Sequence, residues 1–481
     1  MKRLFALLLS AVFFSGALFS CAHSAANKDG DIKDGFAKKD YKGEQFTFLT
    51  VKHTQTASDY YGGGYIDSDT YTGSTVSDAV YERNLAVEEY YNVKVSELVR
   101  IGSDPWDVIH SYRLAGDICF DAVYGWGYKL AACIPKGAFT SIGDLPGVDL
   151  SKSYWSPSAV EDLEIDGKLY VACCDISMNK IKWANVIFCN NTVAEGLNLE
   201  SSPSELCLDG GWTYDRYLRL ATDAAGLGKT GIVSKSLGGL ELAHGAGIYF
   251  AKVSDDGAAL FEYSERLQNI IEATSLAYSD NSTVIKEGYI SKQYGPNQGT
   301  TDDPWDTALE YFCCGNALFC SASASYASQI KASGADYTIL PLPKYSKEQD
   351  NYNSTVSHLA SMIAVLPETR GDVKGASHER TGVILEYMAY KSQEILYPSF
   401  TESILYEDEN GNVREDDKRI LNIIRDSARY EFTSLFGLRD ASLLANEMFL
   451  YPKKAERIYT ERKEALQKEL NEIYESISSD D

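Results

Sequence analysis

Basic residues are in the minority in this sequence. It contains 45 lysines and arginines against 69 aspartates and glutamates, which gives a formal net charge of −24. An excess of negative charge repels phosphate groups, so the composition argues against nucleic acid and against an anionic membrane face as partners. It suits a protein exposed outside the cell.

Histidine is also scarce, with six copies in 481 residues. The six are scattered, and no two stand at the spacing of metal ligands. The sequence also lacks the G-x-S-x-G pattern of the hydrolase nucleophile elbow. We therefore expect neither a metal site nor a cofactor.

No C-x-x-C pattern occurs among the ten cysteines. Without Cys21, nine remain, and an odd number cannot all pair within one chain. Cys173-Cys174 and Cys313-Cys314 are adjacent pairs, which rarely form a disulfide with each other because the geometry is strained. We expect most of the nine to be small buried apolar groups, while an exported protein could still form one or two disulfides.

A long apolar run without charge stands at residues 4–19, directly after Lys2 and Arg3. A basic start before a short apolar run is typical of a secretion signal, so residues 1–20 are predicted to be a signal peptide. The run ends at Leu18-Phe19-Ser20-Cys21, which resembles the lipobox of bacterial lipoproteins. The resemblance implies that Cys21 is lipidated; the alternative is an ordinary cleaved signal with an incidental cysteine. Residues 21–44, polar and charged, are predicted to be a flexible tether.

Beyond the tether, segments with strand and helix patterns alternate. Strands are predicted at 45–51, 93–98 and 119–124, with helices at 78–91 and 104–115 between them, so this part is predicted to be a parallel sheet flanked by helices. Further strands are predicted at 168–173, 183–190, 316–320, 337–340 and 361–366, and further helices at 213–224 and 260–280. In the tail, Leu466, Leu470, Ile473 and Ile477 form one apolar helix face. The chain is therefore predicted to be an α/β protein with enough residues for two lobes.

Several stretches, in this order, resemble the family 1 extracellular solute-binding proteins, the receptor subunits of bacterial ABC importers for sugars. The stretches are 78–84 (DAVYERN) with 87–93, 120–127, 166–170 with 188–191, 211–215, and 315–319 with 339–344. Residues 320–326 (CSASASY) depart from the pattern, because they lack an aromatic residue often found there.

The resemblance implies a two-lobed periplasmic-binding-protein-like fold of type II. Each lobe would be a mainly parallel sheet flanked by helices, with the ligand in a cleft between the lobes. The first lobe would comprise 45–180 with about 345–400, and the second 181–344 with about 401–481. The resemblance also implies that the chain is no enzyme but a monomeric carbohydrate receptor, lipid-anchored on the outer face of the cell membrane, that delivers its ligand to ABC permease subunits.

Trp126 and Tyr128 are the first candidates for ligand contact. They directly follow a predicted strand, and ligand-binding loops of open α/β sheets gather at the carboxyl ends of strands. Flat aromatic rings can cover the apolar C–H face of a sugar while neighbouring groups bond its hydroxyls. The alternative for Trp126 is a place in a lobe core, although Gly125 and Gly127 favour a loop.

Other candidates lie near the expected passages between lobes and at later strand ends. A carboxylate such as that of Asp175 can accept hydrogen bonds from sugar hydroxyls. The remaining candidates are Trp183, Ser321, Ser323, Tyr326, Tyr397 and Phe400.

Three alternatives stay open at this point. An exported glycosidase or lyase would need two carboxylates facing each other in the cleft. An adhesion or scaffold protein would have no cleft ligand. A peptide-binding receptor of the same class would have clustered charges in its cleft.

Overall fold

The computed structural model describes residues 32–33, 35–52, 65–68, 70–234, 239–254, 257–279, 283–286, 304–368 and 378–478. The chain divides into two compact units, Met1–Lys39 and Asp40–Asp481. The predicted signal peptide and Cys21 lie outside the described residues. In the first unit, β1 (Ile32–Lys33) pairs antiparallel with β2 (Phe36–Ala37), so part of the predicted tether forms a short hairpin.

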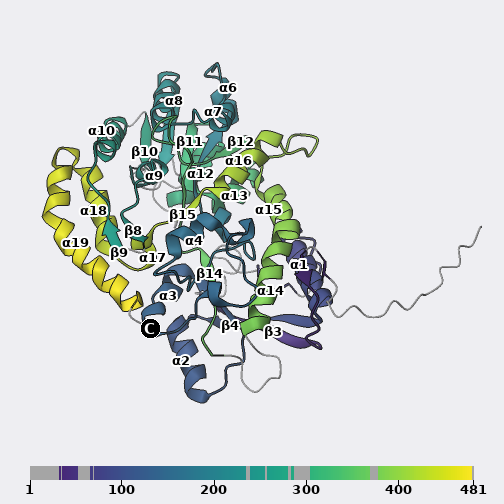
Figure 1. Ribbon diagram of the computed structural model, residues 1–481. Coiled ribbons are helices and arrows are strands. Elements are labelled where there is room, and N and C mark those ends of the chain that lie inside the picture. Colours follow the sequence, from purple (N-terminus) through teal and green to yellow (C-terminus); the bar gives the residue numbers. More distant parts are fainter. Residues whose placement is uncertain are drawn as a thin grey trace, which may run out of the picture. The chain divides into compact units, whose positions relative to one another are not determined.

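A four-stranded sheet forms one part of the second unit (Figure 1). Its order is β14-β5-β3-β4. The strands are β3 (Glu44–Lys52), β4 (Val93–Ile101), β5 (Ala122–Trp126) and β14 (Ser361–Ala364). β3 runs parallel to β4 and β5, whereas β14 is antiparallel to β5. The predicted parallel arrangement of the first three strands is confirmed.

Local sequence explains where the helices of this region begin and end. α2 (Pro105–Ala115) starts where the Asp104 side chain accepts the N–H of Trp106, and it ends at Gly116, whose φ of 66° suits glycine. α1 (Thr75–Tyr91) ends at Asn92, which adopts the left-handed conformation. The predicted helices 78–91 and 104–115 are confirmed, with α1 starting three residues earlier than expected.

A second, five-stranded sheet lies at the other end of this unit (Figure 1), with the order β10-β7-β11-β6-β12. Its strands are β6 (Asn185–Asn190), β7 (Thr230–Ser234), β10 (Val284–Lys286), β11 (Ala317–Ser323) and β12 (Tyr337–Leu340). β10, β7 and β11 are parallel, and β6 is antiparallel to both of its neighbours. β6, β7 and β12 are buried almost throughout. Such continuous apolar strands are typical of a sheet with both faces covered.

Helices cover this second sheet. α8 (Tyr214–Gly226) packs on β7 and β11, and it starts where the Thr213 hydroxyl accepts the N–H of Arg216. The others near it are α6 (Asn191–Glu195), α7 (Pro203–Leu208), α9 (Gly239–Gly245), α10 (Glu265–Ser279), α12 (Pro304–Cys313) and α13 (Ala327–Ala332).

Short elements and the tail complete the second unit. Between β5 and β6 lie α3 (Gly127–Ala131), α4 (Pro157–Leu163) and α5 (Asn179–Lys182). Two small sheets pair β8 (Ala251–Ser254) with β9 (Gly257–Leu260), and β13 (Ser354–Val356) with β15 (Ala428–Tyr430). The later helices are α14 (His378–Lys391), α15 (Tyr397–Ile404), α16 (Glu415–Asp426), α17 (Phe432–Leu435), α18 (Arg439–Leu450) and α19 (Ala455–Ser478).

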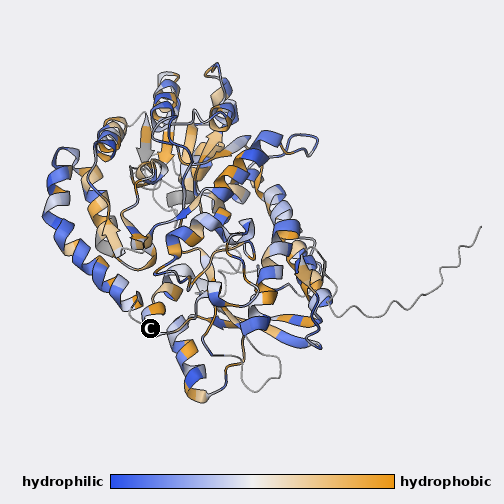
Figure 2. Ribbon diagram, viewed as in Figure 1, coloured by the Kyte–Doolittle hydropathy of each residue, from blue (hydrophilic) through white to orange (hydrophobic). Residues whose placement is uncertain are grey.

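α19 is the long amphipathic helix at the end of the chain. It buries Leu466, Leu470 and Ile477 of the predicted apolar face, while Ile473 is half-buried. Figure 2 shows that most of the rest of this helix is hydrophilic. In the described part of the chain, no helix combines the length and the apolar character needed to cross a membrane.

The predicted strand at 168–173 is wrong. Asp166 and Gly167, with φ of 51° and 68°, turn the chain back so that Ile165 pairs with Lys168. Ala172 then forms a single bridge with Ile363, and no ladder follows. The segment is apolar because it is buried, not because it extends the sheet.

The nine cysteines after Cys21 all lie in described residues and all are free thiols. Six of them are buried: Cys133, Cys173, Cys174, Cys189, Cys207 and Cys320. The expectation that most are small buried groups is confirmed, and none of the nine forms a disulfide in the structure.

Candidate functional site

Two passages of chain link the first sheet to the second and lie side by side. The first crossing, residues 175–184, precedes β6, and the second crossing, residues 356–360, precedes β14. Ala184 and Val356 form an antiparallel bridge, and Ser357 donates its N–H to the carbonyl of Trp183 over 2.9 Å. A ligand bound on this strip would touch segments that belong to both sheets.

An aromatic cluster lies where β5 ends. It consists of Trp126, Tyr128 and His358. The Trp126 and Tyr128 rings are 5.8 Å apart and tilted, and His358 meets Tyr128 edge-on at 5.4 Å. Trp126 and Tyr128 are half-buried and His358 is exposed, so the cluster belongs to the surface rather than to the core. It offers flat apolar area of the kind that covers a sugar face.

The second crossing fixes this cluster in place. Gly127 donates its backbone N–H to the carbonyl of Ala360 at 2.9 Å. Tyr128 likewise donates its backbone N–H to the carbonyl of His358 at 3.2 Å. Behind it, a Cβ on Gly127 would lie 3.0 Å from Leu435 of α17, so a small residue is needed between the two aromatic side chains. The rings are therefore held by backbone bonds and by close packing.

Trp183 and the serines after β11 are bonded to the first crossing. Trp183 is buried at 5 % exposure. Ser323 donates its hydroxyl to the carbonyl of Lys182 at 2.9 Å, and Ala324 donates its N–H to Ala184 at 2.9 Å. Ser323 is half-buried, whereas Ser321 and Tyr326 are buried. Through the two crossings, these hydrogen bonds connect four of the predicted residues or their immediate neighbours: Trp126, Tyr128, Trp183 and Ser323.

A pocket of about 320 Å³ opens beside the first crossing. We call it the serine-lined pocket, because five serines face it: Ser74, Ser77, Ser325, Ser328 and Ser403. Tyr65, Lys182 and the predicted residue Phe400 also line it. The Lys182 ammonium lies 5.6 Å from the centre of the Tyr65 ring.

Arg83 holds the Tyr65 wall of this pocket. Its buried guanidinium donates to the carbonyls of Tyr65, Ile66 and Ile176, to the Ser392 hydroxyl and to the Asn84 side chain, at 2.6–3.2 Å. Burial lowers the pKa of Arg83 to about 9, so it remains charged at neutral pH. One buried cation therefore ties the segment before α1 to the first crossing.

Asp175 is fully buried and already bonded within the protein. Its Oδ1 lies 2.6 Å from the Lys180 ammonium, which also donates to Ser156, and Gln393 donates to its Oδ2 at 3.4 Å. The two buried charges compensate each other, so either one alone would be costly to leave in this crossing. Ligand contact by Asp175 stays a prediction, and this geometry gives it no support.

Tyr397 faces α16. Its hydroxyl donates to Asn422 at 2.5 Å, and the Arg425 guanidinium lies 4.5 Å from its ring centre. Burial raises the pKa of Tyr397 to about 12. The structure does not bring Tyr397 into contact with the aromatic cluster in the described residues.

Three residues of this region were missed by the sequence analysis: His358, Lys182 and Tyr65. Lys182 stands next to the predicted residue Trp183, and His358 stands three residues before the predicted strand 361–366; both are weak signals. Tyr65 lies in a Gly- and Tyr-rich stretch, and only the contacts with Arg83 and Lys182 reveal its place.

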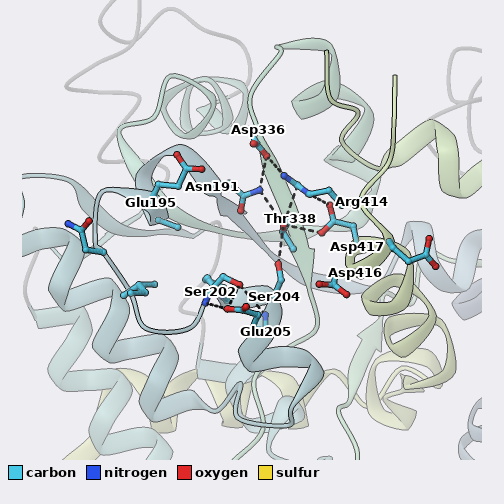
Figure 3. Close-up of a pocket in the computed structure, with 15 residues that line it drawn as sticks. Asn191, Glu195, Ser202, Ser204, Glu205, Asp336, Thr338, Arg414, Asp416 and Asp417 are labelled. Carbon is cyan, nitrogen blue, oxygen red and sulfur yellow. Dashed lines mark hydrogen bonds and ion pairs between the residues drawn. The ribbon is translucent and has the colours of Figure 1, made fainter. Parts of the chain in front are cut away.

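A larger pocket, of about 740 Å³, lies beside β12, an edge strand of the second sheet (Figure 3). Arg414 crosses it and donates to Asp336 and Asp417 at 2.7 Å each. Thr338 donates to Asp417 at 3.1 Å and accepts from Asn191 at 3.3 Å. These groups bond to one another and join α16 to β12, which is a stabilising arrangement.

No protein-family model matches the sequence, and no curated protein matches it. Solved structures do match. A family 1 extracellular solute-binding protein from Alicyclobacillus acidocaldarius has a TM-score of 0.55 at 10% identity, covering 89% of this chain and 100% of its own. The chain has the fold of the family 1 extracellular solute-binding proteins. The predicted fold class, two lobes with helix-flanked sheets, is confirmed; the lobe boundaries stay a prediction.

A second solved structure supports the same fold. It is the galacto-N-biose-/lacto-N-biose I-binding protein of an ABC transporter from Bifidobacterium longum, in complex with lacto-N-biose. Its TM-score is 0.50 at 13% identity, and the match covers 90% of this chain and 98% of that one. At these sequence identities, the similarity to solute-binding proteins shows the fold only. The ligand has to be inferred from the residues of the site.

Proposed function

We propose that this chain is the extracellular substrate-binding protein of an ABC importer and that its ligand is a sugar or oligosaccharide. The aromatic cluster carries the proposal, because half-buried rings at the carboxyl end of β5 are fixed to the strip that joins the two sheets. The solute-binding-protein fold supports it. Binding alone is the function; the chain performs no catalysis.

In this proposal the lobes close on the ligand. A ring stacked on Trp126 or Tyr128 gains apolar contact, and polar groups of both crossings bond its hydroxyls. The ligand shifts the balance toward the closed form only as far as it binds that form more tightly. The closed form is then what the permease subunits receive.

The N-terminus completes the proposal. Cys21 carries lipid after removal of residues 1–20, and the anchor keeps the receptor on the outer face of the membrane beside its permease. More than one acyl chain is needed for stable anchoring, since each buried CH₂ contributes only about 0.8 kcal/mol.

A thermal-shift screen of residues 22–481 against mono- and oligosaccharides tests the ligand class. A ligand at about 100 times its Kd stabilises the folded state by about 2.7 kcal/mol, which raises Tm measurably. Stabilisation by a sugar supports the proposal. If peptides raise Tm and no sugar does, the ligand class is peptide and the proposed carbohydrate ligand is wrong.

A further inference from the structure

Two polar side-chain groups of the aromatic cluster are unused within the protein. In the part of the chain that the structure describes, the Tyr128 hydroxyl and the ring nitrogens of His358 form no hydrogen bond with another protein group. The two rings meet edge-on at 5.4 Å, and the backbone N–H of Tyr128 donates to the His358 carbonyl. Both groups are therefore held in place beside flat rings, with their hydrogen-bonding capacity available to a ligand.

The charged side chains next to the cluster are engaged elsewhere. The Lys129 ammonium lies 5.7 Å from the centre of the Tyr128 ring, but it is paired with Asp104 at 3.2 Å. The Lys182 ammonium, on the first crossing, lies against the Tyr65 ring. α17, which packs on α3, carries no ionisable side chain. A ligand on the cluster therefore meets a hydroxyl and an imidazole rather than an ion.

His358 is the group of the cluster that can change its charge near neutral pH. Loss of surrounding water, and not a neighbouring charge, lowers the pKa of its imidazole. The ring is therefore neutral at pH 7, with one nitrogen that donates and one that accepts. Beside the Tyr128 hydroxyl, it can bond neighbouring hydroxyl groups of a sugar, which also both donate and accept.

We infer that His358 and the Tyr128 hydroxyl bind the hydroxyl groups of an uncharged sugar, and that protonation of His358 weakens this binding. The inference rests on the proposed function and narrows its ligand to a neutral sugar or oligosaccharide. The C–H face of the sugar lies against the flat rings of the cluster, and its hydroxyls exchange hydrogen bonds with the two side-chain groups.

Protonation of His358 opposes binding in two ways. The ligand removes more water from the imidazole, which disfavours its charged form. An imidazolium also has no lone pair left to accept a hydrogen bond from a sugar hydroxyl. The complex therefore binds fewer protons than the free protein, and the affinity decreases as pH falls through the pKa of His358.

Calorimetric titration from pH 5 to pH 8 tests the inference, with the neutral sugar that raises Tm most in the thermal-shift screen as the probe. We expect the wild type to bind it about fivefold more weakly at pH 5 than at pH 7.5. His358→Ala should weaken binding about fivefold at pH 7.5, because one hydrogen bond to the ligand is lost. His358→Gln keeps a donor and an acceptor but takes up no proton in this range, so its affinity should not change with pH.

His110→Gln is the matched control, because His110 is an exposed histidine whose ring also contacts an aromatic ring, that of Trp106 at 5.3 Å. It should leave both the affinity and its pH dependence as in the wild type. Tyr128→Phe keeps the ring and removes the hydroxyl, so it should weaken binding at every pH while the pH dependence remains. A circular dichroism melt of each variant without ligand separates loss of folding from loss of binding. If His358→Ala does not fold, His358→Gln and Tyr128→Phe decide the test.

The outcomes separate the two claims. The inference is overturned, and the carbohydrate receptor stays intact, if the wild-type affinity does not depend on pH or if the dependence survives in His358→Gln. Full affinity in Tyr128→Phe, or tighter binding of a charged sugar than of its neutral counterpart, overturns it as well. If no carbohydrate binds to the wild type, the proposed function and the inference both fail.

Discussion

Ser357 donates its backbone N–H to the carbonyl of Trp183 over 2.9 Å, and this bond joins two crossings that are far apart in sequence. On one side, the second crossing fixes Tyr128 through the His358 carbonyl. On the other, the first crossing is bonded to Ser323 at the end of β11. The two sheets therefore meet at one hydrogen-bonded strip, and a ligand there contacts both.

Gly231 in β7 is a position where no side chain fits. A Cβ there would lie 2.4 Å from the Ala221 carbonyl and 2.6 Å from that of Thr283, and both are backbone atoms that cannot move aside cheaply. We expect Gly231→Ala to lower the free energy of unfolding by about 3 kcal/mol, measured by urea denaturation. Gly226→Ala is the control, because nothing lies within 4 Å of its Cβ and alanine favours the helix. Equal effects of the two changes would contradict this packing of α8 on β7.

The buried carboxyl of Glu386 should make the free energy of unfolding decrease as pH rises. Burial raises the pKa of the Glu386 carboxyl. This carboxyl accepts hydrogen bonds from the Tyr154 hydroxyl and from the Trp155 indole N–H, at 2.6 Å each. Between the ordinary pKa and the raised one, the folded chain binds more protons than the unfolded chain. The free energy of unfolding therefore decreases through that window, by at most about 1.4 kcal/mol per pH unit for one proton.

Denaturation of wild type and Glu386→Gln from pH 4 to 8 checks this dependence. The variant should be less stable overall, because an amide cannot accept both hydrogen bonds equally well. Above pH 4.5, its free energy of unfolding should also fall less steeply with pH than that of the wild type. The same change at exposed Glu464 should leave the slope as it is. An identical slope in wild type and Glu386→Gln would exclude a role of Glu386.

Arg414 should contribute more to stability than its neighbour Arg419. Arg414→Leu leaves the buried Asp417 without its cation, and we expect a loss of about 2 kcal/mol. Burial already raises the pKa of Asp417, so the loss should grow as pH increases. Arg419→Leu removes an exposed pair with Asp416 on the same helix and should change stability by less than about 0.5 kcal/mol. Equal losses would show that the Figure 3 network contributes little.

Lipidation at Cys21 can be tested in a bacterial host. The full chain should incorporate a labelled fatty acid and sediment with membranes, whereas Cys21→Ala should lose the label and leave the membrane fraction. Cys314→Ala alters an exposed cysteine and should behave like the wild type. Label that persists in Cys21→Ala would remove the lipid anchor from the account.

Much of the fold could be predicted because the deciding signals are local. Asp104, Pro105 and Gly116 define both ends of α2, and Thr213 starts α8. The strand before Trp126 was predicted from its run of apolar residues, although β5 begins and ends later than expected. The wrong strand at 168–173 has the same apolar character, and only the turn at Asp166-Gly167 separates it from a true strand.

The site depended on contacts between distant residues, which sequence patterns do not contain. Trp126 and Tyr128 were proposed as site residues from their position after a predicted strand, and they stay a prediction. By contrast, Arg83 reaches Ser392, which stands 309 residues later. Asp175 could have served as a sugar acceptor by type, but its burial beside Lys180 is decided by packing. A sequence gives the chemistry of a side chain and not its partner.

The central claim is tested most directly by calorimetric titration with an oligosaccharide that raises Tm in the thermal-shift screen. The titration compares the wild type with Trp126→Ala and Trp126→Phe. Trp126→Ala removes the ring from the aromatic cluster and should weaken binding by at least about tenfold, or about 1.4 kcal/mol. Trp126→Phe keeps a flat ring and should retain most of the affinity, and Tyr451→Ala, at an exposed ring on another surface, should retain all of it. Full affinity in Trp126→Ala would contradict a carbohydrate site built on the end of β5.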